Sequence, residues 1–273
     1  MRSIRYLYIA SLTKLDTKLI NSYFCTQEIK NMRISFCLLF LFIFTFSFSH
    51  EPEDSTKTKL KASATVSLNS NGISSIPAFS LDKPAVMASI ALGKNRFSYD
   101  PTLAYGLDFK GWFIDSWLHY RLIDRSHFEF RPGFNFSTFF SDFKVENETI
   151  RQAVRYFTIE LTAIYKFSPK TSLTFGYWND RGQDKGTLIG HFFNLIGEKS
   201  DIGIGKNILI DVAFQIFYID YEGSNDGLFL SPKITGSLRN TPFSVFFQPI
   251  QALESNITPY PGFRWNLGVG YTL

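Results

Sequence analysis

The last eleven residues of the chain, 263–273, read Phe-Arg-Trp-Asn-Leu-Gly-Val-Gly-Tyr-Thr-Leu. The odd-numbered positions of this stretch are all large and apolar, namely Phe263, Trp265, Leu267, Val269, Tyr271 and Leu273. The even-numbered positions are polar or small, namely Arg264, Asn266, Gly268, Gly270 and Thr272. Because side chains alternate between the two faces of a strand, this period of two predicts a β-strand with one apolar and one polar face.

The apolar face of this stretch carries aromatic residues near both ends, as a strand that faces lipid does. Its other face is small and hydrophilic, which suits a wet lumen. In both respects the stretch resembles the closing strand of a bacterial outer-membrane β-barrel of the porin-like class. One departure is the final residue, because such chains often end in Phe and this one ends in Leu273. The resemblance implies a closed antiparallel transmembrane barrel that contacts outer-membrane lipid and is recognised through this strand by the barrel-assembly machinery.

The composition favours strands over helices as the membrane-crossing elements. Aromatic residues make up 17% of the chain, with 30 Phe, yet the mean hydropathy is only −0.02. Alternating strands give such an average, because half of each strand is polar. After residue 49, no stretch is apolar over the roughly 18 residues that a helical span requires.

Residues 32–49 predict a secretory signal peptide. Met32-Arg33 supplies a positive start, residues 34–48 are almost wholly apolar, and Ser47-Phe48-Ser49 places small residues at the exit. The alternative is a helical membrane anchor, for which the apolar run is short.

The signal peptide divides the rest of the chain. We expect translation to begin at Met32, so that residues 1–31 are a wrongly assigned leader; the alternative is a genuine longer leader. Residues 50–61 are polar and predict a periplasmic tail, and residues 62–273 predict the barrel.

Charge and cysteine usage exclude several function classes. Residues 1–49 hold 6 of the 28 basic and 2 of the 24 acidic residues, which leaves 22 of each and no net charge in the remainder. No basic patch points to nucleic acid. Cys25 and Cys37 both precede residue 50, so the exported chain has no disulfide, thiol nucleophile or cysteine-based zinc site. We predict no cofactor and no metal.

Turn signals and alternation together predict about twelve strands, with residues 187–205 ambiguous. The strands are expected at residues 62–70, 85–93, 97–109, 112–122, 127–139, 151–167, 173–177, 187–205, 207–221, 228–238, 243–247 and 263–273. With the C-terminus in the periplasm, the short turns at Lys94, Asp124, Ser168 and Asn240 fall on that side. The longer loops, at residues 71–84, 141–150, 181–186, 222–226 and 253–262, fall outside, an asymmetry typical of outer-membrane barrels. The alternative is a soluble β-sandwich or a lipocalin-like barrel.

The polar faces of these strands predict a lumen of mixed charge. The predicted lumen and selectivity residues are Asp115, Arg121, Glu129, Arg131, Glu160, Lys166, Asp211, Lys233 and Arg264. Residues 75–84 are apolar for an exposed loop and contain two prolines, so we expect them to pack in the lumen or cover its rim. The predicted function is a narrow channel for small solutes, or a structural barrel whose lumen is filled by salt bridges.

The alternative function is an outer-membrane lipid-modifying enzyme that works at the barrel rim. His119 with Asp115, or His127 with Glu129, would supply a base and an orienting acid. Residues two apart on a strand point the same way by geometry alone, and no serine motif accompanies either pair.

Overall fold

The structure is a computed structural model that describes residues 59–145, 148–222, 225–257 and 260–273. The predicted leader and signal peptide, and residues 50–58 of the predicted periplasmic tail, lie outside the described residues. The strands, in chain order, are β1 (Lys61–Asn69), β2 (Ala85–Lys94), β3 (Phe97–Gly106), β4 (Gly111–Tyr120), β5 (Ile123–Asp124), β6 (Phe128–Val145), β7 (Glu148–Ser168), β8 (Thr171–Gly182), β9 (Ile189–Ile204), β10 (Ile208–Tyr221), β11 (Asn225–Leu238), β12 (Phe243–Ser255) and β13 (Phe263–Thr272). Within the described ranges, no helix is long and apolar enough to cross a membrane.

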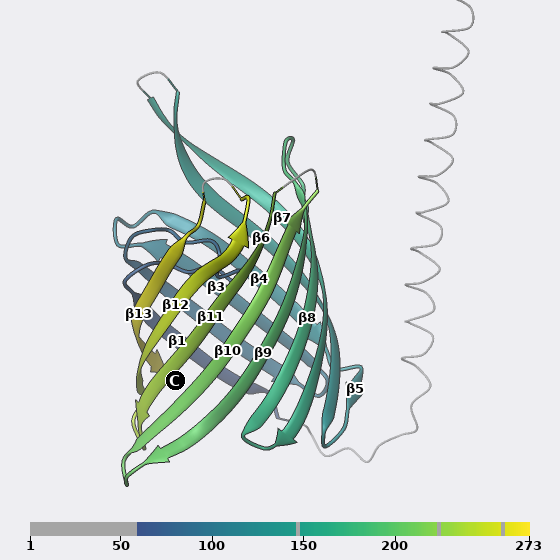
Figure 1. The fold of residues 1–273 in the computed structure, drawn as a ribbon, viewed down its shortest axis with the longest axis vertical. Helices are drawn as coiled ribbons and strands as arrows, with labels where there is room; N and C mark the ends of the chain where they lie inside the picture. The colour runs from purple at the N-terminus through teal and green to yellow at the C-terminus, as the bar shows by residue number, and fades with distance from the viewer. Residues whose placement is uncertain (1–58, 146–147, 223–224, 258–259) are drawn as a thin grey trace, which may run out of the picture. The chain divides into compact units, whose positions relative to one another are not determined.

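Twelve of these strands close into one antiparallel barrel (Figure 1). The first strand pairs with the last, with Val66 opposite Tyr271, and β4 pairs with β6, with His119 opposite Gly133. The short β5 adds only two residue pairs at the edge of β6. Closure gives the backbone N–H and C=O groups at the strand edges hydrogen-bond partners, which lipid cannot provide. The predicted fold class, a closed antiparallel barrel of about twelve strands, is confirmed.

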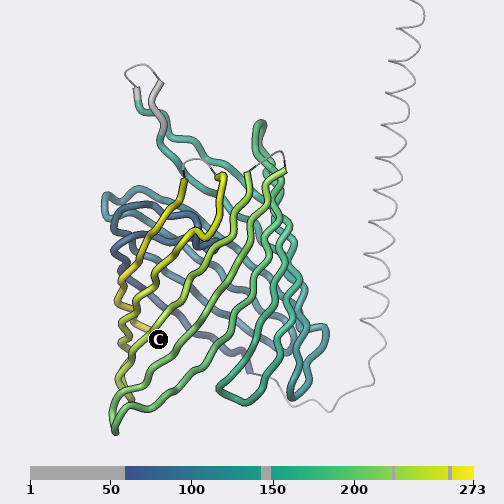
Figure 2. Tube along the Cα trace, viewed as in Figure 1, coloured from purple at the N-terminus to yellow at the C-terminus, as the bar shows by residue number. Residues whose placement is uncertain are grey.

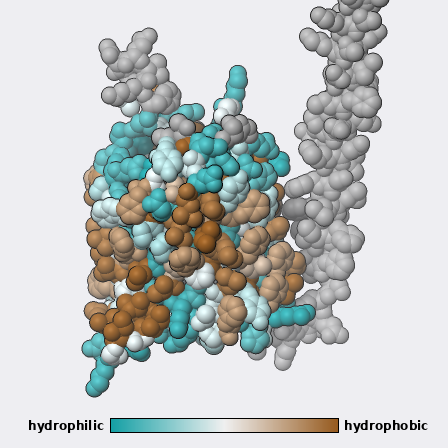
Figure 3. All heavy atoms as spheres, in the orientation of Figure 1, coloured by the Kyte–Doolittle hydropathy of each residue, from teal (hydrophilic) through white to brown (hydrophobic). Residues whose placement is uncertain are grey.

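The closing strand shows why the barrel suits a membrane. Phe263, Trp265 and Leu267 point outward and are exposed, whereas Asn266 and Gly268 point inward and are buried. The same alternation recurs around the barrel, so that apolar side chains cover much of its flank while polar side chains gather at the upper rim (Figure 3). An exterior of this kind would be costly in water and is stabilised by contact with lipid hydrocarbon.

The two ends of the barrel differ. We call the end that carries the β1–β2 and β6–β7 connections the loop end, and the end near the C-terminus the turn end (Figure 2). At the turn end, Asn95 and Asn240 adopt positive φ angles of 54° and 60° in the predicted tight turns. Asparagine tolerates this left-handed conformation better than most residues, which favours hairpins at these sites.

Four predicted loops are partly strand. The strand residues are 141–145 and 148–150 of β6 and β7, 181–182 of β8, 225–226 of β11 and 253–255 of β12. In the first, Asp142 faces Arg151 across the hairpin, and the carboxylate also accepts a 2.6 Å hydrogen bond from Lys110. A run of charged side chains argues against a strand only where the strand would contact lipid. Beyond the membrane, opposite charges on two neighbouring strands stabilise the pairing of those strands.

Most of the ambiguous stretch 187–205 forms β9, which covers Ile189–Ile204. Its alternation is poor in the sequence because two inward positions, Phe192 and Ile196, are apolar, while Phe193 and Leu195 on the outer face are also apolar. A strand that is apolar on both faces loses the period-two signal.

The prediction for residues 97–122 is wrong at two points. Strand β3 ends at Gly106 rather than Phe109, because Phe109 has a φ of 59° and donates its backbone N–H to Gly106 in a turn. Trp112, which alternation places outside, is only 7% exposed. The register shifts where Tyr105 pairs with Gly111, and this irregularity accompanies the inward position of the indole.

Candidate functional site

The β1–β2 connection, residues 70–84, folds into the barrel; we call it the inlet loop. Its backbone forms a small hairpin, in which Ser74 donates its N–H to Phe79 and Leu81 donates its N–H to Gly72. The expectation that residues 75–84 pack in the lumen or at its rim is correct.

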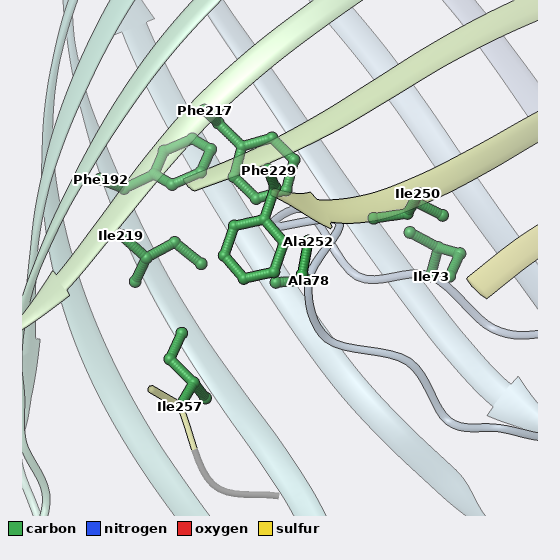
Figure 4. Close-up of a cluster of buried hydrophobic side chains, with 9 residues drawn as sticks. All are labelled: Ile73, Ala78, Phe192, Phe217, Ile219, Phe229, Ile250, Ala252 and Ile257. Atoms are coloured by element: carbon green, nitrogen blue, oxygen red, sulfur yellow. The ribbon is translucent and has the colours of Figure 1, made fainter. Parts of the chain in front are cut away.

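An apolar cluster holds the inlet loop against one side of the lumen. Ile73 and Ala78 of the loop pack against side chains from β9 to β12 and the segment after it (Figure 4). The buried members of the cluster are Ile73, Ala78, Phe192, Phe217, Ile219, Phe229, Ile250, Ala252 and Ile257. The rings of Phe217 and Phe229 are stacked with centroids 4.9 Å apart. Burial of this apolar area stabilises the loop in its inward position.

Polar contacts anchor the inlet loop at two further points. Arg264 of β13 donates a 2.7 Å hydrogen bond to the Ala78 carbonyl and lies 3.3 Å from the Asp82 carboxylate. Further round the wall, the Ser75 hydroxyl donates to Asp115 of β4. The loop tip is therefore tied to two strands that are separated by β1, β2 and β3.

The base of the inlet loop carries an exposed ion pair. Lys83 Nζ donates a 2.6 Å hydrogen bond to Asp108 in the β3–β4 turn. This hydrogen bond is the main reason that the pKa of Asp108 lies below its usual value. Because both side chains are well exposed, the pair contributes little stability by itself.

A cavity of about 300 Å³ lies between the inlet loop and strands β4 to β8. Its charged lining residues are Asp115 and Asp180, both acidic. Asp115 is 1% exposed and also receives a long 3.5 Å contact from the Asn135 amide, while Asp180 accepts a 2.5 Å hydrogen bond from Thr158. The aromatic lining residues are Phe79, Trp112, Trp117, Phe139, Tyr156, Trp178 and Tyr221. We call this space the loop-end cavity.

A second cavity, of about 540 Å³, lies on the other side of the inlet loop. It is lined mainly by small and polar side chains of β1, β2 and β8 to β13, and its charged residues are Glu198 and Lys233. Lys233 Nζ lies 4.4 Å from the centroid of the Phe246 ring. Ser74, Ser75 and Trp178 line both cavities, so the loop tip lies at their boundary.

The lumen wall beside the loop-end cavity is filled by a charged network centred on His119. Its Nδ1 lies 2.9 Å from Asp100 and its Nε2 lies 2.7 Å from Glu160. The imidazole also stacks on Trp117, with an interplanar angle of 4°. Arg131 approaches Glu160 at 3.8 Å. Both ring nitrogens face carboxylates. His119 of β4 is therefore linked to Asp100 of β3 and to Glu160 of β7.

The other predicted lumen residues occupy different surroundings. Glu129 is buried and accepts a 3.1 Å hydrogen bond from Lys166. Arg121 lies in the connection after β4, where it pairs with Asp124 at 2.8 Å. Asp211 accepts a hydrogen bond from the Asp201 backbone.

The second histidine of the enzyme hypothesis lies apart from the first. His127 is exposed at the turn end, just before β6, and its Nδ1 lies 3.1 Å from the Lys166 carbonyl oxygen. The structure therefore does not bring the two predicted acid–histidine pairs into one site. Among the described residues, no group of three acidic, histidine or cysteine side chains is placed to hold a metal ion.

The sequence prediction did not include Trp117, Trp178 and Asp180, which line the loop-end cavity. Trp178 and Asp180 share a face of β8, opposite to Phe175 and Tyr177 on the outer face. Alternation carried three residues further along this strand would have found both. Trp117 shares its face with Asp115 and His119 in the same way.

Comparisons with known proteins bear on the fold. The sequence matches no protein-family model and no curated protein. Among solved structures, the "KdgM porin" is similar with a TM-score of 0.51 and 10% identity, over 77% of this chain and 98% of that chain.

Two further structures are similar at lower scores. The COG4313 outer membrane channel from Pseudomonas putida F1 has a TM-score of 0.47 and 8% identity, over 81% of this chain and 99% of that one. OmpT of Vibrio cholerae has a TM-score of 0.37 and 8% identity, over 82% and 100%. At these identities the likeness concerns the fold alone. The fold of this chain is that of the bacterial outer-membrane β-barrels.

Proposed function

We propose that this protein is an outer-membrane channel for small polar solutes, with the inlet loop as its constriction. The observation that carries the proposal is the pair of cavities that meet at Ser74, Ser75 and Trp178, one on each side of the loop. A solute that crosses the lumen would pass from the acidic loop-end cavity, past the loop tip, to the polar cavity below. Selection would then depend on the width and charge at the tip.

The placement in the outer membrane rests on the apolar exterior and on the fold that the chain shares with outer-membrane barrels. We infer that β13 contacts lipid with its Phe263 and Trp265 face and is the strand recognised during barrel assembly. Export requires a signal, for which residues 32–49 are the candidate.

Single-channel conductance tests the proposal. The full chain would be expressed in a Gram-negative host, extracted from its outer membrane and reconstituted in a planar bilayer in KCl. The wild-type barrel should give small, stable steps. Deletion of residues 73–80, bridged by a short Gly-Ser linker, should increase the step size because it removes the constriction.

A point variant and its control make this test sharper. Arg264→Ala removes the anchor on the Ala78 carbonyl and should give larger or more frequently fluctuating steps. Arg239→Ala removes an arginine that is exposed at the turn end and should behave like the wild type. A folded barrel that stays silent both with and without residues 73–80 would contradict the channel function and favour a structural barrel.

A further inference from the structure

The charge of the loop-end cavity is one-sided. Of the residues that line it, the charged ones are Asp115 and Asp180. Within the described part of the chain, neither carboxylate lies within salt-bridge distance of a lysine, arginine or histidine; their partners are the hydroxyls of Ser75 and Thr158 and the amide of Asn135. A carboxylate away from bulk water is costly without a cation, and hydroxyl donors offset only part of that cost.

Three basic residues near this end of the barrel have other partners. Arg155 lies 2.6 Å from Asp184, Lys110 lies 2.6 Å from Asp142, and Arg264 binds the inlet loop. None of these three lines the cavity. The protein therefore does not supply the missing positive charge from the side chains around the cavity, and a cation from solution would fit there.

The aromatic walls favour an organic cation over a metal ion. Trp112, Tyr156, Trp178 and Tyr221 line the cavity together with the two carboxylates. Faces of Trp and Tyr rings attract ammonium groups, and such sites recognise alkylated ammonium ligands. A metal site would instead need several oxygen ligands in close coordination. A volume of about 300 Å³ is at the lower end of the range for small-molecule sites.

We propose that the loop-end cavity binds a small organic cation through an ammonium group held by the Asp115 and Asp180 carboxylates among the aromatic rings that line the cavity. The inference rests on the proposed channel function for the route by which the cation arrives. It deepens that function, because it names cationic solutes as the preferred class. The inlet loop forms part of the site through Ser75, so the same segment holds the solute and limits its passage.

Tryptophan fluorescence can report binding. Trp112, Trp117 and Trp178 line the cavity, and Trp265, the only other tryptophan in the chain, is on the outer face. The wild-type barrel, in detergent at low salt, would be titrated with choline. The matched probe is 3,3-dimethyl-1-butanol, which has the shape of choline without the charge. A saturable fluorescence change with choline and none with the neutral analogue is expected.

Three variants separate the site from the rest of the barrel. Asp115→Asn and Asp180→Asn should each weaken choline binding by about tenfold or more, because each removes one charged contact. Glu254→Gln makes the same charge change at an exposed residue that does not line the cavity, and should bind choline like the wild type. Heat-modifiable migration in gel electrophoresis would verify that each variant is folded.

The outcomes are distinct from those of the conductance test. Equal responses to choline and to its neutral analogue, or no response from a folded barrel, would overturn the cation site. The same result from a barrel that conducts KCl would leave the channel function standing. Saturable choline binding by a barrel that never conducts would support the site and contradict the channel.

Discussion

His119 Nε2 lies 2.7 Å from Glu160 Oε2, although strand β6 separates the strands that carry these two residues. The contact passes over Gly133, which is paired with both of them in register. A Cβ atom at this glycine would lie 2.6 Å from His119 Cδ2 and 2.7 Å from Glu160 Oε2. The two side chains meet because the strand between them has no side chain in that row.

Substitution of this glycine tests the contact. Gly133→Ala should force His119 and Glu160 apart and lower the free energy of unfolding by about 1–3 kcal/mol, as overpacking usually does. Gly197→Ala is the control, because a Cβ atom there meets nothing within 4 Å and the residue is also in a strand. Urea unfolding in lipid vesicles would measure both. Equal stabilities for the two variants would show that the row can adjust without cost.

The two histidines should differ sharply in their importance. His119→Ala leaves the buried Glu160 carboxylate without its histidine partner, and should destabilise the barrel by about 1–3 kcal/mol. His127→Ala changes an exposed residue and should stay within about 0.5 kcal/mol of the wild type. Unfolding curves of both variants provide the comparison. Loss of turnover in a lipid-hydrolysis assay by a folded His119→Ala barrel would instead support the enzyme hypothesis.

The apolar anchor of the inlet loop should matter more than lipid-facing residues of the same type. Phe229→Ala removes a fully buried ring beneath the loop and should cost about 3–5 kcal/mol of stability. Phe247→Ala removes a ring from the outer face of β12, where lipid can fill the space, and should cost less. Hydrogen exchange of residues 71–84 should rise in the first variant and not in the second. Unchanged exchange in both would show that the polar anchors suffice.

The ion pair at the base of the inlet loop should depend on pH in one direction. The folded-state pKa of Asp108 is lowered by Lys83, so its stabilising effect is present above the ordinary aspartate pKa and is lost as the pH falls through the folded-state value. The difference in Tm between wild type and Asp108→Asn should therefore be small and positive at neutral pH, and should vanish in acid. A difference that grows on acidification would contradict this sign.

Alternation predicted the barrel well because lipid outside and water inside impose opposite requirements on alternate residues. Phe263 and Trp265 face outward and Asn266 faces inward, as their spacing indicates. Alternation does not identify the inward face where the lumen of the barrel is itself lined by apolar side chains. Phe192 is on the inner face of β9 because it packs under the inlet loop, and nothing local distinguishes it from a lipid-facing residue.

The cavity residues required knowledge of contacts between distant segments. Ser75 and Asp115 meet across the lumen, and the path of the inlet loop decides that contact. Trp112 turns inward for a related reason: a Cβ atom on Gly72 would lie 2.7 Å from its ring, so the indole and the loop backbone fit together only at a glycine. Strand periodicity has no access to such a fit.

The inlet loop follows directly after β1, the strand that pairs with β13 to close the barrel. Its anchors on Phe229, Ile250 and Arg264 come from the last part of the chain, and β1 itself pairs with β13. Contacts between segments so distant in sequence form late, because a long stretch of chain must be ordered before they are gained. The β1–β13 pairing and the anchoring of the inlet loop must therefore be completed together. Until the C-terminal strand is in place, the folding barrel is open along β1 and its inlet loop is not held in the lumen.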